Sequence, residues 1–246
     1  MDKALYISMT GASQSMRAQT IQAHNLANAS TTGFRADLAQ ARSMPMYGPG
    51  MATRVYGMTE NPGTDFSAGS LQRTGNALDI AIRGEGWIAV QAPDGTEAYT
   101  RAGDLQVDLF GQLLTGSGLP VLGNNGPVVL PEFDTLELGD DGTISIRERG
   151  QGAEVLAVLD RIKLVNPDNA ALIKGADGLM RTRDGLESEA DGNVQLVSGY
   201  LESSNVNVVE AMVEMISLAR SYEMNVKFMQ TVQQNSEASA RLLQTQ

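Results

Sequence analysis

Only a few residues have types and spacings that could support chemistry, and none of them forms a complete site. The chain contains one histidine, His24, and no cysteine. A Ser-His-Asp triad would have to use this histidine, and neither a two-histidine metal site nor a thiolate site can be built within one chain. His24 lies in an amphipathic segment with no acidic residue within six positions of it. We therefore expect no catalytic residue and no metal ligand.

A glycine-containing run, Gly84-Glu-Gly-Trp-Ile-Ala89, has the spacing of a dinucleotide-binding loop. The loop would need a helix directly after its glycines, but residues 88–90 are Ile-Ala-Val, which is typical of a strand. We interpret the run as a tight turn between two strands. Trp87, the sole tryptophan, then belongs to the core beside that turn. No bound cofactor is expected.

Carboxylates gather in one short stretch of the middle of the chain. The cluster comprises Glu132, Asp134, Glu137, Asp140 and Asp141. Calcium loops and glycosidases both use grouped carboxylates, but this spacing does not match a calcium loop. Acidic residues are common along the whole chain, with 29 acidic against 18 basic residues. We interpret the cluster as a solvated acidic face.

The charge and the apolar content narrow the class of protein. A net charge of −11 without a basic run disfavours nucleic-acid binding and attraction to anionic lipid. Apolar residues make up 42% of the chain, which is enough for a folded core. No apolar run approaches the length of a membrane span, and the N-terminus does not have the pattern of a cleavable signal peptide. We expect no direct membrane insertion.

The elements that must position any functional residue fall into an α+β arrangement. Residues 3–28 have an apolar stripe at alternating spacings of four and three, which predicts a helix of roughly 40 Å. The stripe comprises Leu5, Met9, Ala12, Met16, Gln19, Ala23 and Leu26. Near the other end, Asn205 or Asn207 can cap a second long helix, and Glu210 has the capping-box spacing from Asn207. Its stripe comprises Val209, Met212, Ile216, Ala219, Val226 and Met229, with support from Val213, Tyr222 and Val232.

Between the helices the sequence is predicted to be β-rich. Asp-Gly or Asn-Gly pairs recur from Asp94-Gly95 to Asp191-Gly192, and such pairs favour tight hairpin turns. We predict four parts: an N-terminal helix (1–35), an extended connecting arm (36–76), a β-rich middle domain (77–200) and a C-terminal helix (201–246). The spacing does not choose between a sandwich and a bent, barrel-like sheet.

Long apolar stripes must be buried, so the two terminal helices are natural partners for each other. Alanine, methionine and glutamine make their stripes a weak isolated pair. We therefore expect a coiled-coil-like pair that completes its burial only against neighbouring subunits.

Several motifs resemble those of flagellar rod and hook proteins. The first is Ala23-His-Asn-Leu-Ala-Asn-Ala-Ser-Thr-Thr-Gly-Phe-Arg35, and the second is Gly199-Tyr-Leu-Glu-Ser-Ser-Asn-Val-Asn-Val-Val-Glu-Ala-Met212. Between them, residues 79–87, 99–103 and 111–123 are similar to the middle region of the same family. The motifs occur in the family's order and cover nearly the whole chain. Within the family, the opening Met1–Tyr6 and the run 33–38 favour the proximal rod, with the distal rod as the alternative.

The resemblance implies a structural subunit of the bacterial flagellar basal-body rod, not an enzyme. It implies helical assembly that transmits torque across the periplasm, with the terminal helices forming an inner layer. The implied partners are other rod subunits, copies of the same chain and the flagellar type III export apparatus. It also implies export without a cleavable signal peptide. A soluble enzyme or ligand-binding β-domain remains the alternative from a different class.

The expected assembly interface combines the two stripes with the polar and aromatic residues of the two motifs. Its residues are Leu5, Met9, Met16, Asn25, Leu26, Asn28, Phe34, Asn205, Asn207, Met212, Ile216, Tyr222, Val226 and Met229. Aspartate at position 26 or 216 is predicted to block assembly, since a buried unpaired charge costs roughly 3–5 kcal/mol.

Overall fold

The computed structural model describes residues 2–45, 55–60, 63–148 and 157–244. The chain forms two compact units, each assembled from separated segments. One unit, called here the helical unit, contains Met1–Ala27, Asp37–Thr64 and Val206–Gln246. The other, called the β unit, contains Asn28–Ala36 and Asp65–Asn205. The fold is α+β, with a helix toward each end and β structure in the middle.

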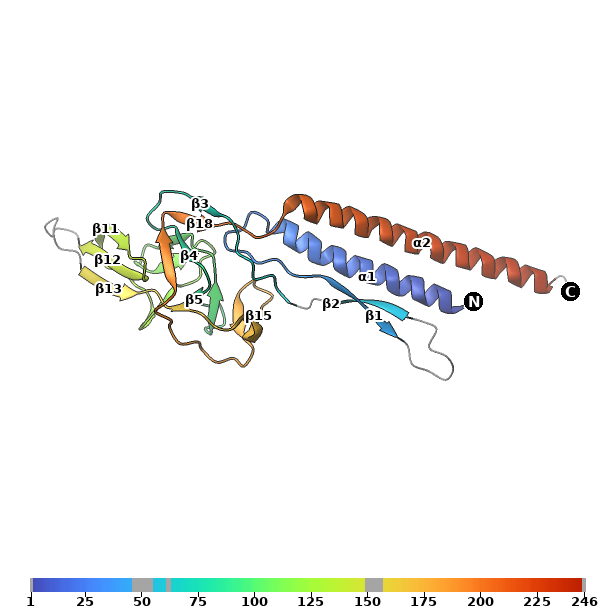
Figure 1. Cartoon of the computed structure of the whole chain (residues 1–246), viewed down its shortest axis with the longest axis horizontal. Coiled ribbons are helices and arrows are strands. Elements are labelled where there is room, and N and C mark those ends of the chain that lie inside the picture. The colour runs from blue at the N-terminus through green and yellow to red at the C-terminus, as the bar shows by residue number, and fades with distance from the viewer. Residues whose placement is uncertain (1, 46–54, 61–62, 149–156, 245–246) are drawn as a thin grey trace. The chain divides into compact units, whose positions relative to one another are not determined.

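The helical unit is built on α1 (Asp2–Ala27) and α2 (Val208–Gln244). Both predicted helices are confirmed. They run side by side in opposite directions, so the start of α1 and the end of α2 lie at the same end of the unit (Figure 1). The Asn207 side chain caps α2, because its Oδ1 accepts hydrogen bonds from the backbone N–H groups of Val209 (3.1 Å) and Glu210 (3.3 Å).

A two-stranded hairpin completes the helical unit. Its strands β1 (Gln40–Pro45) and β2 (Val55–Glu60) pair in antiparallel register, with Gln40 opposite Glu60. Gln14 of α1 holds β2: its Oε1 accepts a 2.7 Å hydrogen bond from the Thr59 backbone N–H, and its carbonyl accepts a bond from the Thr59 hydroxyl. The region predicted as an extended arm thus contains two paired strands, β1 and β2.

The β unit contains sixteen short strands and one 3₁₀ turn among its described residues. The strands are β3 (Leu71–Arg73), β4 (Ile80–Arg83), β5 (Trp87–Gln91), β6 (Glu97–Thr100), β7 (Leu105–Val107), β8 (Leu113–Thr115), β9 (Leu122–Gly123), β10 (Gly126–Pro127), β11 (Phe133–Leu138), β12 (Thr143–Glu148), β13 (Ala157–Arg161), β14 (Leu164–Val165), β15 (Leu172–Lys174), β16 (Met180–Thr182), β17 (Gln195–Ser198) and β18 (Tyr200–Glu202). The 3₁₀ turn, η1, spans Asn169–Ala171.

The strands of the β unit form several small antiparallel sheets. The largest has the order β14-β5-β6-β16-β15, and a three-stranded sheet has the order β11-β12-β13. Four two-stranded ladders complete the unit: β17-β4, β18-β3, β7-β8 and β10-β9. Strand pairs distant in sequence, such as β18 with β3, tie the ends of the unit together.

Two apolar clusters fill the β unit. The larger includes Ile80, Ile88, Leu113, Ile144 and Leu196, all of which are buried. The smaller surrounds Trp87 and includes Tyr99 and Met180. Because the strands are short, each contributes at most four buried side chains, and the clusters form by convergence of many strands.

Candidate assembly interface

Small side chains form most of the buried face of α1. Its buried residues are Ser8, Ala12, Ser15, Ala18 and Asn25. The Ser15 hydroxyl lies 3.3 Å from the Ser221 hydroxyl of α2, and a Cβ at Gly11 would lie 2.9 Å from Oδ1 of Asn225. The two helices therefore approach closely over small and polar groups.

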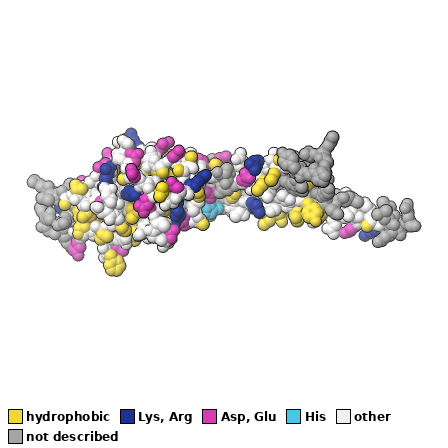
Figure 2. All heavy atoms as spheres, turned by 90° about the horizontal axis from the view of Figure 1, so that it is seen from below, with side chains coloured by type: hydrophobic (Ala, Val, Ile, Leu, Met, Phe, Trp, Pro, Cys, Tyr) yellow, Lys and Arg dark blue, Asp and Glu magenta, His cyan; other side chains and the backbone are white. Residues whose placement is uncertain are grey.

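The large apolar residues of the predicted stripes lie mainly outside this contact. Met9, Met16, Met212 and Ile216 are exposed, with Met16 and Ile216 each at 55%. Leu5 and Tyr222 lie at the lower limit of exposure, while Leu26, Val226 and Met229 are half-buried. The sequence predicts that the two stripes pack mainly against each other. In the structure, small residues at adjacent helical positions form the close approach between α1 and α2 instead. Figure 2 shows hydrophobic side chains at the surface of the helical unit.

The asparagines of the expected interface make specific bonds within the chain. In the helical unit, Asn25 is buried and exchanges two 2.9 Å hydrogen bonds with the backbone N–H and carbonyl of Asp37. His24 Nδ1 lies 3.1 Å from the same residue's carboxylate. The sole histidine thus makes a local polar contact, which agrees with a structural role for this helix residue.

In the β unit, Asn28 and Asn205 shape the two segments that connect to helices. Asn28 closes a turn, since its Oδ1 accepts a 3.2 Å hydrogen bond from the Thr31 hydroxyl. Asn205 Oδ1 accepts a 2.8 Å bond from the Ala36 backbone N–H, and its Nδ2 donates to the carbonyls of Asp65 and Ser67. A single amide side chain therefore holds three chain segments together.

Phe34 is the remaining predicted interface residue of the β unit. It is buried, and Lys174 Nζ lies 3.9 Å from the centre of its ring. The same ammonium donates a 2.7 Å hydrogen bond to the carbonyl of Arg35. Phe34 is thus a packed residue of the β unit.

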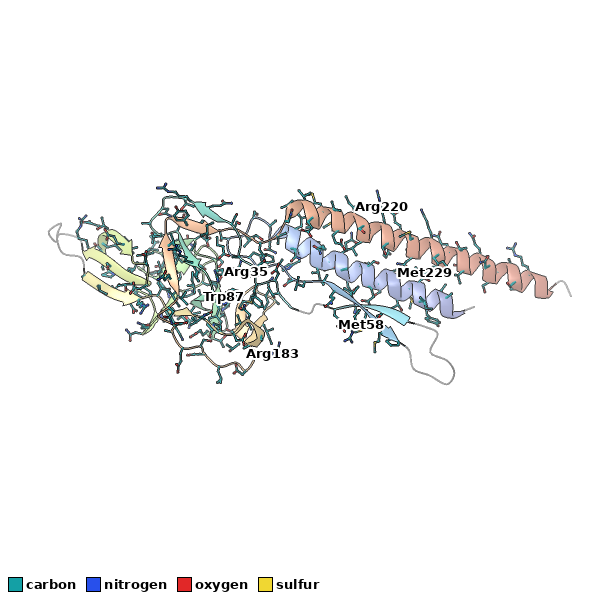
Figure 3. The ribbon with its side chains drawn as sticks, viewed as in Figure 1. Arg35, Met58, Trp87, Arg183, Arg220 and Met229 are labelled. Carbon is teal, nitrogen blue, oxygen red and sulfur yellow. The ribbon has the colours of Figure 1, made fainter. Side chains whose placement is uncertain are left out.

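A buried ionic cluster, called here the Glu202 clasp, consists of Glu202, Arg35, Arg101 and Trp87. The Glu202 side chain is 1% exposed. Its Oε1 lies 2.7 Å from Arg35 Nη1, and its Oε2 accepts a 3.1 Å hydrogen bond from Arg101 Nη1. Both guanidinium groups lie over the Trp87 ring, at 5.9 and 5.4 Å from its centre. Figure 3 shows Arg35 and Trp87 close together.

Backbone groups complete the clasp. Glu202 Oε1 also accepts a 2.9 Å hydrogen bond from the Gly69 N–H, and the Glu202 carbonyl accepts a bond from the Gly33 N–H. Gly33 has a φ of 65°, and a Cβ there would overlap the carbonyl of Arg101. Glycine is therefore required at this position for both its conformation and its close approach.

The clasp holds two positive charges against one negative charge. Burial lowers the pKa of Arg101 below its ordinary value; the Glu202 carboxylate opposes this shift, and Arg35 adds to it. The face of Trp87 offsets part of the excess positive charge through cation–π attraction. The Glu202 clasp has a structural role, because none of its side chains is open to a substrate.

The sequence analysis did not select the charged residues of the clasp. Each nevertheless lies in a motif quoted there: Arg35 ends the first motif, Glu202 lies in the second, and Arg101 lies within residues 99–103. A charged residue in each of three separate motifs could have indicated a shared ionic cluster. Only the fold brings residues 101 positions apart into contact.

The other candidate features of the sequence have structural roles. The Gly84–Gly86 run is a turn between β4 and β5, as predicted, and Trp87 is buried. The five carboxylates of the acidic cluster are all exposed, as predicted for a solvated face, while Phe133, Leu136 and Leu138 of β11 pack on the core. Asp141 accepts hydrogen bonds from the Thr143 N–H (3.0 Å) and hydroxyl (2.7 Å), which lower the pKa of its carboxyl group.

Within the described ranges, no group of three His, Cys, Asp or Glu side chains is placed to hold a metal ion. None of the helices in those ranges is long and apolar enough to cross a membrane.

Comparison with known proteins identifies the family. Residues 5–35 match the family described as "Flagella basal body rod protein", and residues 81–151 match "Flagellar hook protein FlgE/F/G D1 domain". Residues 197–242 match "Flagellar basal body rod FlgEFG protein C-terminal". The chain is 41% identical to the flagellar basal-body rod protein FlgF of Salmonella typhimurium, over 99% of each chain. The chain belongs to the flagellar basal-body rod protein family.

Other relatives give the same result. The FlgF protein of Escherichia coli K12 is also 41% identical over 99% of each chain. The rod protein FlgG of Buchnera aphidicola subsp. Schizaphis graminum is 32% identical, over 98% of this chain and all of the relative. These relatives are structural proteins and not enzymes. The chain is accordingly a FlgF-like structural subunit of the flagellar basal body, where it assembles with other rod subunits.

The Glu202 clasp connects the three regions of the chain that match the family. Arg35, Arg101 and Glu202 lie one in each of the three matched regions. In this rod subunit the three regions therefore meet at one buried carboxylate.

Proposed function

We propose that this rod subunit occupies the proximal rod and transmits torque across the periplasm through a helical assembly. The observation that supports this most directly is the exposure of large apolar side chains along both helices, including Met16 and Ile216. Long exposed apolar faces mark interaction surfaces. In a helical assembly each subunit offers different faces to its neighbours, so both helices take part in heterologous contacts.

The proposed interface comprises the two predicted stripes and the terminal asparagines. In the assembly, the α1–α2 pair becomes part of a coiled-coil-like inner layer, while the β unit lies in an outer layer. The region 36–76 acts as an extended arm toward neighbouring subunits, with the β1–β2 hairpin as its ordered part. Copies of this chain and neighbouring rod proteins bury the stripes.

Truncation at the boundaries of the two units tests this division. Deleting residues 1–27 or 206–246 should abolish incorporation into basal bodies while the β unit keeps its fold. Asn205 is retained because it belongs to the β unit. Incorporation is measured by immunoblot of purified basal bodies, and folding by Trp87 fluorescence. A subunit that lacks both ends and still enters the rod would contradict the proposal.

A point substitution tests the stripe itself. Ile216→Asp should block assembly, since burying an unpaired charge against a neighbour costs roughly 3–5 kcal/mol. Ser217→Asp is the matched control, because it adds the same charge at an exposed polar position of α2. Motility on soft agar and basal-body composition are the measurements. Normal motility of the Ile216 variant would remove Ile216 from the interface.

Export through the flagellar type III system belongs to the same proposal. A chain without cysteine cannot form premature disulfides before it is threaded through a channel. Accumulation of the subunit inside cells that lack a working export apparatus is the expected result. Normal delivery in such cells would exclude this route.

The distal rod is the alternative position, because FlgG proteins are also relatives at 30% identity or more. Gold labelling of an epitope on the subunit in purified basal bodies separates the two. Label confined to the membrane-proximal end of the rod supports the proximal position, and label along the distal length supports the alternative.

A further inference from the structure

Methionine is distributed very unequally between the two units. Eleven of the twelve methionines of the chain belong to the helical unit, and only Met180 belongs to the β unit. Because the chain has no cysteine, these thioethers are its only sulfur atoms. Leucine has a similar volume and an equal preference for helices, so neither packing nor helix formation accounts for this bias.

Many of the methionines in the helical unit are accessible to water. Met44 and Met58 of the hairpin are exposed, and Figure 3 shows Met58 on β2. Among the described residues of α1 and α2, four more methionines have exposed fractions of 48–64%. These four, called here the exposed methionines, are Met9, Met16, Met212 and Met224.

The exposed methionines lie within the apolar faces of their helices. Side chains three or four positions apart share a helix face, which places Met9 beside Leu5 and Met212 beside Ile216. Met16 follows Met9 by seven positions, or two turns, and so lies on the same face of α1. All five side chains are exposed. The thioethers therefore belong to the surface that neighbouring subunits are proposed to cover.

The contact between α1 and α2 is made by other residues. The buried positions of α1 include Ser8, Ala12 and Ser15, and the Ser15 hydroxyl lies 3.3 Å from that of Ser221. A chemical change at the exposed methionines would therefore alter the outer surface of the helix pair and leave the contact within the pair in place.

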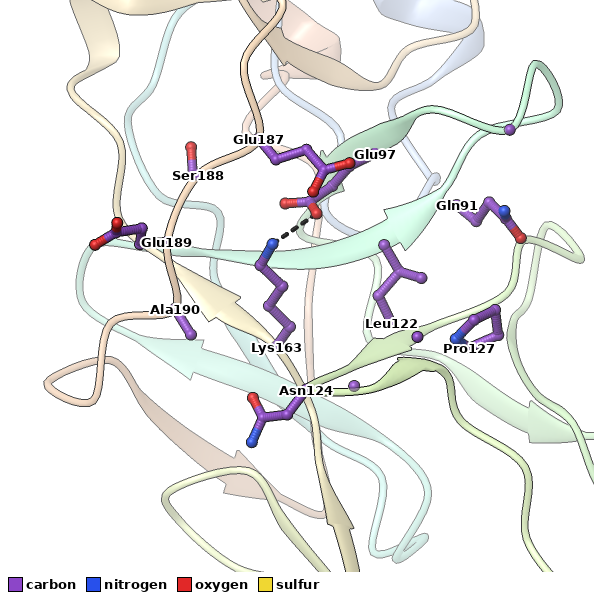
Figure 4. Close-up of a pocket in the computed structure, with 13 residues that line it drawn as sticks. Gln91, Glu97, Leu122, Asn124, Pro127, Lys163, Glu187, Ser188, Glu189 and Ala190 are labelled. Carbon is purple, nitrogen blue, oxygen red and sulfur yellow. Dashed lines mark hydrogen bonds and ion pairs between the residues drawn. The ribbon is translucent and has the colours of Figure 1, made fainter.

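The β unit protects its single methionine. Met180 is 2% exposed and packs in the smaller apolar cluster beside Trp87. A hollow of about 590 Å³ opens into this unit, where Glu97 pairs with Lys163 at 2.6 Å (Figure 4). None of the described residues that line the hollow is a methionine. An oxidant dissolved in water therefore meets the thioethers of the helical unit before that of Met180.

A hydroperoxide oxidises an exposed thioether by transfer of one oxygen atom. The sulfur lone pair attacks one oxygen of hydrogen peroxide, the O–O bond breaks, and a sulfur–oxygen bond forms. The proton on the transferred oxygen passes to the departing hydroxide, which leaves as water. Sulfur loses the two electrons that the peroxide gains. The product, methionine sulfoxide, is a polar side chain where an apolar one stood.

We propose that the exposed methionines form an oxidation-sensitive site of the unassembled subunit, and that their conversion to sulfoxides by a hydroperoxide prevents its entry into the rod. A sulfoxide buried in an apolar contact loses its hydrogen bonds to water, which opposes association. Methionine sulfoxide reductases reverse the reaction, so the block is reversible. Selective oxidation stands on the structure of the chain alone, and only the block of assembly rests on the function proposed above.

Limited oxidation of the purified full-length chain with hydrogen peroxide tests the selectivity. Peptide mass spectrometry should find the exposed methionines converted before Met180 has reacted to a measurable extent, because susceptibility follows exposure. In urea, all methionines should react alike. Circular dichroism of the oxidised chain should keep the helical signal. Equal reaction of Met9 and Met180 in the folded chain, or loss of the helices on oxidation, would overturn the proposal.

Paired substitutions separate the polarity of a sulfoxide from the loss of methionine. Met16→Gln and Met212→Gln together place a polar oxygen on each helix at similar side-chain length. They should lower the amount of subunit in purified basal bodies by about tenfold. Met16→Leu and Met212→Leu are the matched control, because they keep the apolar volume and should incorporate like the parent chain. Normal incorporation of the glutamine variant would overturn the block of assembly.

Exposure of growing cells to hydrogen peroxide tests the oxidation itself. A variant with leucine at all four exposed methionines should continue to enter new basal bodies under a peroxide dose that reduces incorporation of the parent chain. The hairpin methionines are left unchanged in both. An equal reduction for the two chains would overturn the proposal, because the loss would then come from another target. The rod role itself fails only if the Ile216→Asp variant assembles, so the two failures are distinguishable.

Discussion

The helical unit and the β unit bury different kinds of residue. In the β unit, branched and aromatic side chains such as Ile88 and Tyr99 are fully enclosed. In the helical unit, the buried positions of α1 carry serine, alanine and asparagine, while methionines remain at the surface. The comparison teaches that one unit closes its core by itself, and that the other keeps its largest apolar groups available for a partner.

The difference has a direct energetic consequence. Burial of apolar surface contributes roughly 25 cal/mol per Å², so the β unit gains its stability within one chain. The helical unit leaves much of that gain unrealised until another surface covers it. A rod subunit needs both properties, because the β unit must keep its shape while the helices join the polymer.

The largest expected effect is the loss of the clasp carboxylate. Glu202→Ala should destabilise the β unit by roughly 3–5 kcal/mol, since it leaves two buried guanidinium groups without a counter-ion. Urea unfolding followed by fluorescence of Trp87, which lies against both arginines, measures this change. Glu137→Ala, at an exposed carboxylate, should have little effect. A loss below about 1 kcal/mol for Glu202→Ala would mean that the clasp contributes little beyond its packing.

The next effect concerns the apolar core. Leu113→Ala should cost roughly 2–5 kcal/mol, because Leu113 is completely buried in the larger cluster. Leu109→Ala is the control from the neighbouring turn, where Leu109 is fully exposed, and should change stability by no more than about 0.5 kcal/mol. Thermal unfolding of each purified chain gives the two values. Equal losses for both leucines would contradict the contrast between a closed core and an open surface.

Replacing a large apolar side chain of α2 should have a much smaller effect on the stability of the isolated chain. Ile216→Asp should change the stability of the isolated chain by no more than about 0.5 kcal/mol, because Ile216 is 55% exposed there. Circular dichroism at 222 nm during heating reports on the helices. A marked loss of helix in the isolated variant would show that Ile216 stabilises the subunit itself, and the assembly test would then lose its meaning.

Another small effect is a pH dependence in the β unit. Hydrogen bonds from Arg181, at 3.0 and 2.7 Å, hold the pKa of the Asp177 carboxyl below its ordinary value. A lowered folded-state pKa stabilises the fold above the unfolded-state pKa of about 4, and this stability is lost as the pH falls through the folded-state value. Because the pair is partly exposed, it contributes less than about 1 kcal/mol. Comparing Asp177→Asn with the parent chain at pH 7 and pH 2–3 should show a difference that disappears in acid; a difference that persists would assign it to packing.

Local patterns in the sequence predicted the long elements well. The helices followed from apolar periodicity, the α2 cap from Asn207 and its capping-box spacing, and the β4–β5 turn from paired glycines. Each of these features depends on residues within a few positions of each other. Short strands were harder: β11 was hidden in an acidic cluster, and β18 lay inside the second motif, because strands of three to six residues carry little periodicity.

The expected interface was only partly readable from the sequence. Apolar stripes identify a face that needs burial, but they do not say whether a partner helix or a neighbouring subunit supplies it. On α1 the close approach to α2 uses Ser15 and the positions near Gly11, which a search for large apolar residues passes over. Small residues matter here because they let two backbones approach, a property visible only once both helices are placed.

The sequence by itself determined the class of this protein. One histidine, no cysteine and an acidic balance without a basic run removed the common catalytic and nucleic-acid functions, and the ordered motifs indicated the rod family. Only the tertiary structure decided that Arg35 and Arg101 share the buried carboxylate of Glu202, and that Glu97 pairs with Lys163. The physical reason is that a charge's role depends on its burial and its partners, and both arise when distant segments of the chain come together.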